Sequence, residues 1–210
     1  MLIMGLVYTV RLIWLFRFKP GRERQAATGR AGAGKSKGII YSWMNIAMPW
    51  GMESTRTKPV LYAQFSVFHL GVVAAIGLSF IIPYAPRLLE SSGLVIVLQS
   101  LTGAAFVVAL VRIYRRVSQK VMRAISSPDD YFSLGLLTVW FCLAFFAAPN
   151  RPAHGEATPL AFFLITAFFL LYVPFSKISH YLYYPFTRYY FGKTMAHRGV
   201  YPLKHSHPVE

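Results

Sequence analysis

The chain contains very little cysteine and few acidic side chains. Of its 210 residues, 1 is cysteine and 7 are Asp or Glu. The single thiol, Cys142, excludes an internal disulfide and a four-cysteine iron–sulfur site. The sequence also lacks a Cys-x-x-Cys-His motif, which excludes a covalently attached c-type haem. Any haem would therefore be held by side-chain ligation alone.

Charged residues are scarce as well, and they are unevenly spread. They make up 14% of the chain, whereas a soluble domain carries about 25%. The long uncharged runs between the charged clusters are typical of a membrane protein with several spans. The net charge of +15 comes from Lys and Arg between these runs. We therefore expect anionic membrane lipids or an acidic partner protein as the counter-charge, and no nucleic acid.

Four hydrophobic runs are each about 20 residues long, which is enough to cross a bilayer as an α-helix. They are residues 60–83, 93–112, 131–149 and 159–180. Residues 2–18 are also mostly apolar, but Arg11 interrupts them, so we expect a short first helix. The predicted fold is all-α, one integral membrane domain over residues 1–210 with a bundle of about five transmembrane helices.

The positions of Lys and Arg predict the orientation. Residues 17–58 hold 9 of them, residues 112–123 hold 5 and the tail from Lys177 onward holds 5, whereas the turns near Arg87 and Arg151 hold 1 each. The basic loop 19–58 and the basic tail 181–210 are therefore expected in the cytoplasm. With five spans, the N-terminus is then outside and the C-terminus is cytoplasmic. The expected location is the inner, or cytoplasmic, membrane.

Residues 29–36 match the Gly-x-x-x-x-Gly-Lys-Ser pattern of a phosphate-binding loop. The functional motif follows a buried strand and opens a helix. Here a basic turn after a membrane segment precedes the match, with no strand. We interpret these residues as a flexible glycine-rich loop and expect no ATP or GTP binding.

Two histidines, His69 and His180, lie inside predicted spans. An ionisable side chain at membrane depth is costly without a partner. The topology places both near the cytoplasmic surface, at the same depth. Two neutral imidazoles on different helices can hold one haem iron from both sides. The alternative, which the spacing leaves open, is that His69 only hydrogen-bonds across a helix interface.

Other residues carry weaker interpretations. Small residues at 71, 74, 75 and 77 predict close approach of a neighbouring helix or of a flat macrocycle. Four basic residues near the expected haem depth are candidates to pair with haem propionates: Arg56, Lys58, Lys177 and Arg188. The excess of Lys and Arg on the cytoplasmic side would also explain their presence. The remaining histidines lie in loops or the tail, namely His154, His197, His205 and His207. Of these, His197 is an alternative iron ligand.

Three motifs carry a family resemblance: Phe68-His69-Leu70-Gly71, Ser127-Pro128-Asp129-Asp130-Tyr131 and Val173-Pro174-Phe175-Ser176-Lys177-Ile178-Ser179-His180. Over residues 40–192 the chain resembles the cytochrome b superfamily of the respiratory nitrate reductase gamma subunit. It looks closest to the cytochrome b membrane subunits of sulfate-reducer transmembrane redox complexes, such as the high-molecular-weight cytochrome complex. The resemblance implies a five-helix membrane subunit in which His69 and His180 bind the cytoplasmic-side haem b.

In that family a second histidine pair binds an outer haem. The matching positions here are Phe80 and Phe162, so we expect one haem. The resemblance implies an electron-transfer subunit of a respiratory oxidoreductase complex rather than a stand-alone enzyme. It would exchange electrons between quinone and an iron–sulfur partner on the cytoplasmic face, beside other membrane subunits. The alternatives are a cofactor-poor anchor or assembly subunit and, with less support, a transporter.

Overall fold

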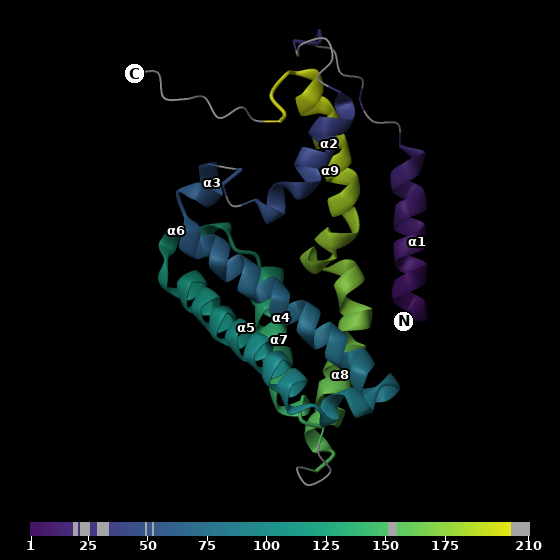
Figure 1. Cartoon of the computed structure of the whole chain (residues 1–210), viewed down its shortest axis with the longest axis vertical. Coiled ribbons are helices and arrows are strands. Elements are labelled where there is room, and N and C mark those ends of the chain that lie inside the picture. The colour runs from purple at the N-terminus through teal and green to yellow at the C-terminus, as the bar shows by residue number, and fades with distance from the viewer. Residues whose placement is uncertain are drawn as a thin grey trace. The chain divides into compact units, whose positions relative to one another are not determined.

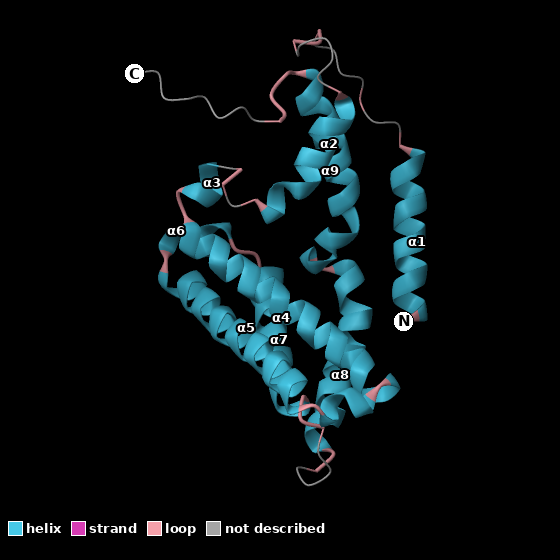
Figure 2. Cartoon of the chain, in the orientation of Figure 1, coloured by secondary structure: helices cyan, strands magenta, loops and turns pink. Residues whose placement is uncertain are grey.

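The computed structural model describes residues 1–18, 21, 26–28, 34–48, 50–51, 53–150 and 155–202. These residues form α-helices joined by short 3-10 turns, with no strand among them (Figures 1 and 2), which confirms the all-α prediction. The chain forms two compact units. Unit 1 comprises Met1–Gly5 and Ala63–Ile178, and unit 2 comprises Leu6–Tyr62 and Ser179–Glu210.

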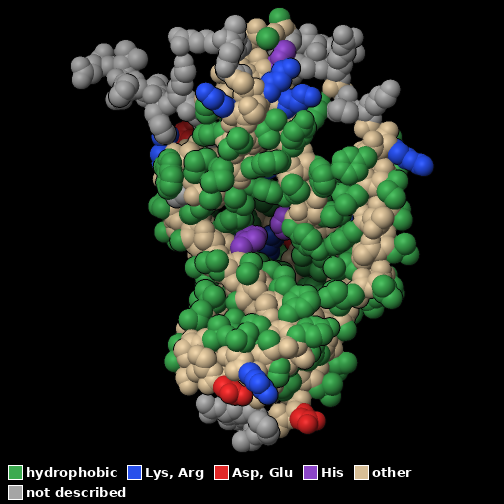
Figure 3. Space-filling view, turned by 45° about the vertical axis from the view of Figure 1, so that its right-hand side comes forward, with side chains coloured by type: hydrophobic (Ala, Val, Ile, Leu, Met, Phe, Trp, Pro, Cys, Tyr) green, Lys and Arg blue, Asp and Glu red, His purple; other side chains and the backbone are tan. Residues whose placement is uncertain are grey.

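Four helices in the described part of the chain are long and apolar enough to cross a membrane. They are α4 (Pro59–Tyr84), α5 (Ser92–Ser118), α7 (Pro128–Ala147), and α8 (Ala157–Tyr172) with the 3-10 turn η4 (Val173–Phe175). Hydrophobic side chains cover most of the face drawn in Figure 3, as lipid contact requires. The protein is a multi-pass membrane protein.

The first predicted span is a helix but a short one. Helix α1 (Leu2–Arg17) has 16 residues, or about 24 Å of helix against a hydrocarbon core of about 30 Å. It is shorter than α4, α5 and α7 and than the 19 residues of α8 taken together with η4. That α1 crosses the bilayer stays a prediction.

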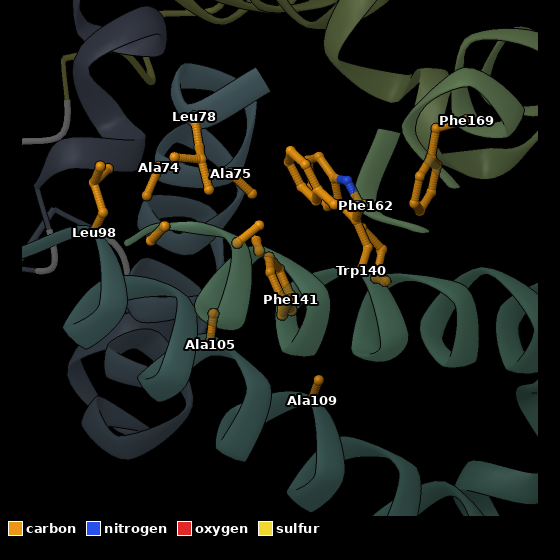
Figure 4. Close-up of a cluster of buried hydrophobic side chains, with 14 of the residues drawn as sticks. Ala74, Ala75, Leu78, Leu98, Ala105, Ala109, Trp140, Phe141, Phe162 and Phe169 are labelled. Carbon is orange, nitrogen blue, oxygen red and sulfur yellow. The ribbon is translucent and has the colours of Figure 1, made fainter. Parts of the chain in front are cut away.

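The core of unit 1 combines small residues with aromatic rings. Figure 4 shows Ala74, Ala75 and Leu78 of α4 and Ala105 of α5 near Phe141 of α7. Helices α4 and α5 approach so closely that a Cβ added at Gly71 would lie 2.2 Å from the Cβ of Ala105. Of the two partners proposed for these small residues, a neighbouring helix is the one that the structure shows at Gly71.

The predicted span 159–180 is not one continuous helix. Proline at 174 has no N–H to donate, and Ser176 is extended, with ψ 170. Helix α8 therefore ends at Tyr172, the turns η4 and η5 (Lys177–Ser179) follow, and His180 begins a new helix, α9 (His180–His197). The expectation that His180 ends the last span is corrected here: it is the first residue of the helix after it.

Unit 2 is built around the packing of α2 (Lys35–Met44) against α9. A Cβ added at Gly38 would lie 2.5 Å from the Cβ of Ala196, and one added at Gly192 would lie 2.6 Å from the oxygen of Gly38. The remaining elements of unit 2 are most of α1, the turn η1 (Asn45–Ala47) and the short helix α3 (Glu53–Arg56). Much of the predicted basic tail 181–210 is therefore helical.

Candidate functional site

The ring of His69 is half-buried on α4, and its orientation is set within its own helix. Its Nδ1 lies 2.8 Å from the carbonyl oxygen of Phe65, whose ring centroid is 4.1 Å away. A carbonyl oxygen can only accept, so Nδ1 donates the hydrogen. In the neutral ring Nε2 then carries the lone pair, the arrangement found in histidines that bind metals through Nε2.

A cation lies beside the turn of His69. The guanidinium carbon of Arg112, on α5, is 4.4 Å from the ring centroid of Phe68, a cation–π distance. Phe68 also contacts Phe141 edge-to-face, with ring centroids 5.2 Å apart. Sequence reasoning counted Arg112 only as an orientation signal and missed this position. Arg112 could have been found from the sequence, because it lies at the inner end of a predicted span and His69 was expected at the same depth.

Two of the three motifs that carry the family resemblance meet in unit 1. Ser127 and Asp130 form a capping box at the start of α7, with the Ser127 N–H and hydroxyl each 2.8 Å from Asp130 Oδ2. The Nζ of Lys177 donates to Asp130 Oδ2 and to Ser127 Oγ, both at 2.8 Å. The start of α7 is thereby tied to the chain that follows α8.

The neighbouring acid, Asp129, makes a second set of bonds between the same two segments. The hydroxyl of Tyr172 donates to Asp129 Oδ1 and lies 2.8 Å from Ser133 Oγ. The N–H of Lys177 donates to Asp129 Oδ2 at 3.2 Å. We call Ser127, Asp129, Asp130, Tyr172 and Lys177 the polar cluster. It fixes the turn that precedes His180 to α7.

The polar cluster bears on the predicted role of Lys177. Its ammonium is ion-paired with Asp130, while its side chain keeps 60% of its surface exposed. A lysine has three N–H donors, so a contact with a haem propionate would be shared with Asp130. That contact stays a prediction.

The other predicted site residues lie at separate places in unit 2. Helix α9 has His180 as its exposed first residue and His197 as its half-buried last residue. The 17 residue steps between them correspond to about 25 Å of straight helix, so the two histidines are not interchangeable in position. Arg188 lies over the ring of Tyr184, at 5.5 Å.

Arg56 ends α3, Lys58 precedes α4, and both are exposed. His69 belongs to unit 1, whereas His180 belongs to unit 2, so their pairing on one iron stays a prediction. His154, His205 and His207 lie outside the described residues, as do residues 29–33 of the glycine-rich loop.

Aromatic rings occupy both positions that correspond to outer haem ligands in the family. Phe162 is fully buried and stacks on Trp140 at 6.1 Å with an interplanar angle of 10°. The Trp140 Nε1–H donates to Thr166 at 2.9 Å, which holds the stack in place. Phe80 is 45% exposed and stacks on Tyr84.

Unit 2 also contains two buried polar atoms that have no hydrogen-bond partner among the described residues. Ser42 Oγ and Asn45 Oδ1 make no hydrogen bond to the described part of the chain. Nearby, the Tyr41 hydroxyl donates to the oxygen of Gly51 at 3.1 Å. Burial, with Tyr201 close by, raises the pKa of Tyr41 above its usual value.

The described residues contain no group of three or more His, Cys, Asp or Glu side chains placed to hold a metal ion. A structural metal ion usually takes four protein ligands. Haem is different, because its macrocycle supplies four nitrogens and the protein need supply only the axial ligands. That His69 binds a haem stays a prediction.

Comparison with known proteins gives one distant relative. The chain is 26% identical over 176 residues to a protein of Nitratidesulfovibrio vulgaris strain Hildenborough, a sulfate reducer, and the match covers 81% of this chain and 76% of that protein. The name of that relative states no activity. No protein-family model matches the chain, and no solved structure matches it. The homology is distant and assigns no family.

Proposed function

We propose that this protein is the haem b-containing membrane subunit of a respiratory oxidoreductase complex. It transfers electrons between the membrane quinone pool and an iron–sulfur partner on the cytoplasmic side. When bound, the haem supplies one-electron chemistry. The chain contributes ligation, burial and the surrounding charges, which set the reduction potential.

The observation that carries this proposal is the state of His69. It lies in a helix of membrane length, where an imidazole is costly without a function. Its Nδ1–H···O bond to Phe65 leaves Nε2 as the atom that can bind iron, and metal-binding histidines commonly donate their other ring N–H to a carbonyl in this way. His180 is the proposed second ligand, on the strength of the Pro-Phe-Ser-Lys-x-x-His motif.

The aromatic packing of unit 1 supports one haem rather than two. An outer haem would need the position of Phe162 for a ligand and space for a macrocycle beside it. That ring is instead fully buried and stacked on Trp140, and phenyl groups cannot bind iron. Opening this core would also expose a large packed aromatic surface.

Basic side chains support the cytoplasmic placement of the haem and of its partner. Four basic residues remain the predicted partners of the haem propionates: Arg56, Lys58, Lys177 and Arg188. Arg112 is a fifth candidate. Its guanidinium lies next to the turn of His69, and arginine binds carboxylates in bidentate fashion. An acidic face on the iron–sulfur partner would complement the basic loop 19–58 and tail 181–210.

A cofactor-poor anchor or assembly subunit is the second candidate. The same buried Phe162 favours it, because the resemblance places a haem ligand at this position and phenylalanine cannot bind iron. The distant relative from a sulfate reducer accords with both candidates. Haem content separates them.

The test is a reduced-minus-oxidised visible spectrum of the full chain, purified from a membrane in which haem is available. We expect the band of a bis-histidine b haem at one haem per chain. His69→Ala and His180→Ala should each abolish it, whereas His197→Ala, at the far end of α9, should leave it unchanged. Circular dichroism of each variant checks that the helices persist.

Three results would overturn the proposal. One is a wild-type protein without haem when the membrane contains it, which would leave the anchor subunit. Another is a band that survives both His69→Ala and His180→Ala. The third is two haems per chain, which would contradict the interpretation of Phe162.

A further inference from the structure

A cavity in unit 1 lies at the other ends of the membrane helices, away from the polar cluster. It has a volume of about 650 Å³, within the range of about 300–1,000 Å³ typical of small-molecule sites. It is formed by the turn η2 (Pro86–Glu90), the start of α5 and the residues that follow α7. Its polar lining includes Arg87, Glu90, Ser92, Gln99 and Asn150.

The helix ends place this cavity at a membrane surface. Helix α4 ends at Tyr84 and α5 begins at Ser92, so the cavity mouth lies where two apolar helices leave the hydrocarbon core. By the distribution of Lys and Arg this is the outer surface. Gln99, about 10 Å further along α5, marks the inner limit, where its amide donates to the oxygen of Phe145 at 3.1 Å.

Among the described residues that line the cavity, one is a cation and one is an anion. Arg87 and Glu90 both line it, and neither side chain makes an ion pair or hydrogen bond with any other residue that the structure describes. The N-cap of α5, Ser91, makes no side-chain capping bond, so the first N–H groups of this helix lack a side-chain acceptor. These groups add a partial positive charge on the Ser92 side of the cavity.

The rest of the wall is apolar. Val95 is half-buried, and Ile96, which is 61% exposed, continues along α5 toward the hydrocarbon core. Leu89 is buried beneath the turn. A ligand that fits is therefore charged at the surface, with both signs close together, and apolar further in.

We infer that this cavity binds the head group and glycerol region of a zwitterionic phospholipid with a primary ammonium group. Arg87, Ser92 and the start of α5 receive the phosphate, because guanidinium groups and helix N-termini bind phosphate oxygens. Glu90 receives the ammonium. The acyl chains follow Val95 and Ile96 into the bilayer.

A quinone head group is a weaker occupant of this cavity. It offers carbonyl oxygens but no charges to meet Arg87 and Glu90. From Tyr84 back to His69 there are also 15 residue steps of α4, or about 22 Å of helix, which separates the cavity from the proposed haem ligand. The inference does not depend on the haem.

The test is native mass spectrometry of the purified full chain after exchange with phosphatidylethanolamine, phosphatidylcholine and phosphatidylglycerol in equal amounts. We expect one retained lipid, with phosphatidylethanolamine preferred over phosphatidylcholine by roughly tenfold. Arg87→Gln should lower the retention of all three roughly tenfold. Glu90→Gln should remove the preference for phosphatidylethanolamine.

Arg123→Gln, on α6 (Lys120–Ile125), loses the same charge elsewhere and should retain lipid as the wild type does. If Arg87→Gln does not fold, Arg87→Lys keeps the positive charge but lacks the planar guanidinium group, and it should still weaken lipid retention. Equal retention in wild type and in Arg87→Gln and Glu90→Gln would overturn the inference. So would a copurifying quinone that Arg87→Gln removes.

Discussion

Both units contain a close contact between helices, but the hydrogen bonding of their buried hydroxyl groups differs. In unit 1 the contact is Gly71 against Ala105, and in unit 2 it is Gly38 against Gly192. The buried hydroxyls of Thr102 and Thr138 in unit 1 donate to carbonyls one turn back, at 2.8 and 2.7 Å. In unit 2 the buried hydroxyl of Ser42 has no partner among the described residues.

This difference follows from the surroundings of each unit. The helices of unit 1 cross hydrocarbon, where an unpaired polar group costs several kcal/mol, and each of these threonine hydroxyls is bonded within its own helix. Helix α2 begins with two lysines in its first turn and is only 10 residues long. Close packing of small residues is thus shared, whereas the bond to a carbonyl one turn back is made by Thr102 and Thr138 of unit 1 and not by the hydroxyl of Ser42 within the described residues.

The largest effect is expected at Gly192. A methyl group there would lie 2.6 Å from a backbone oxygen and 2.7 Å from the Cα of Ile39, and backbone atoms cannot move aside as a flexible side chain can. Gly192→Ala should lower the stability of unit 2 by about 2–3 kcal/mol. Proteolysis rates of α2 and α9 in the purified protein measure this.

The matched control is Gly77→Ala on α4. A Cβ at Gly77 meets no atom within 4 Å, and alanine is favoured over glycine within a helix. The control should be neutral or slightly stabilising. Equal sensitivity of the two variants would show that the packing of α2 on α9 is not as tight as described.

A smaller effect is expected in the polar cluster of unit 1. Asp130→Ala removes the capping box and the ion pair with Lys177 together, at a cost of about 1–1.5 kcal/mol. Lys177→Met removes the partly exposed ion pair alone, at about 0.5 kcal/mol. Thermal unfolding of both variants and of the double variant gives the coupling between them.

In the double variant the two effects should not add, because the ion pair is lost only once. Fully additive effects would mean that the Lys177 ammonium does not interact with Asp130 in solution. Added salt should lower the thermal stability of the wild type toward that of Lys177→Met, because salt screens an exposed ion pair.

The smallest expected effect is an increase in stability. Ser42→Ala removes a buried hydroxyl that has no partner among the described residues, and relief of its desolvation should stabilise unit 2 by up to about 1 kcal/mol. Thr102→Ala is the counterpart in unit 1 and should destabilise, because it removes a bonded hydroxyl. Loss of stability in Ser42→Ala, read by the same proteolysis assay, would show that the hydroxyl has a partner.

The membrane helices were predictable because hydropathy and length act locally. The predicted spans 60–83 and 131–149 correspond to α4 and α7 with ends that differ by a few residues. The capping residue Ser127 was predictable for the same reason. Helix α9 was not predicted, because its sequence is aromatic and basic and resembles an interfacial tail more than an apolar span.

The candidate site was predictable only in part. His69 and His180 stand out by being ionisable within apolar sequence, and local spacing suffices to find them. The contact of Arg112 with Phe68 joins residues 44 positions apart, and that of Lys177 with Asp130 joins residues 47 apart. No local pattern specifies either partner, because a charged side chain at a helix end has several possible neighbours.

Composition and hydropathy alone determined that this chain is helical, spans a membrane several times and carries basic segments between its spans, because the bilayer imposes one length and one backbone conformation on any segment that crosses it. The tertiary structure decided where α8 breaks, which helix His180 begins and which cation meets which acid. Those outcomes depend on packing between distant segments, where proline geometry, small residues and hydrogen-bond partners must fit at the same time.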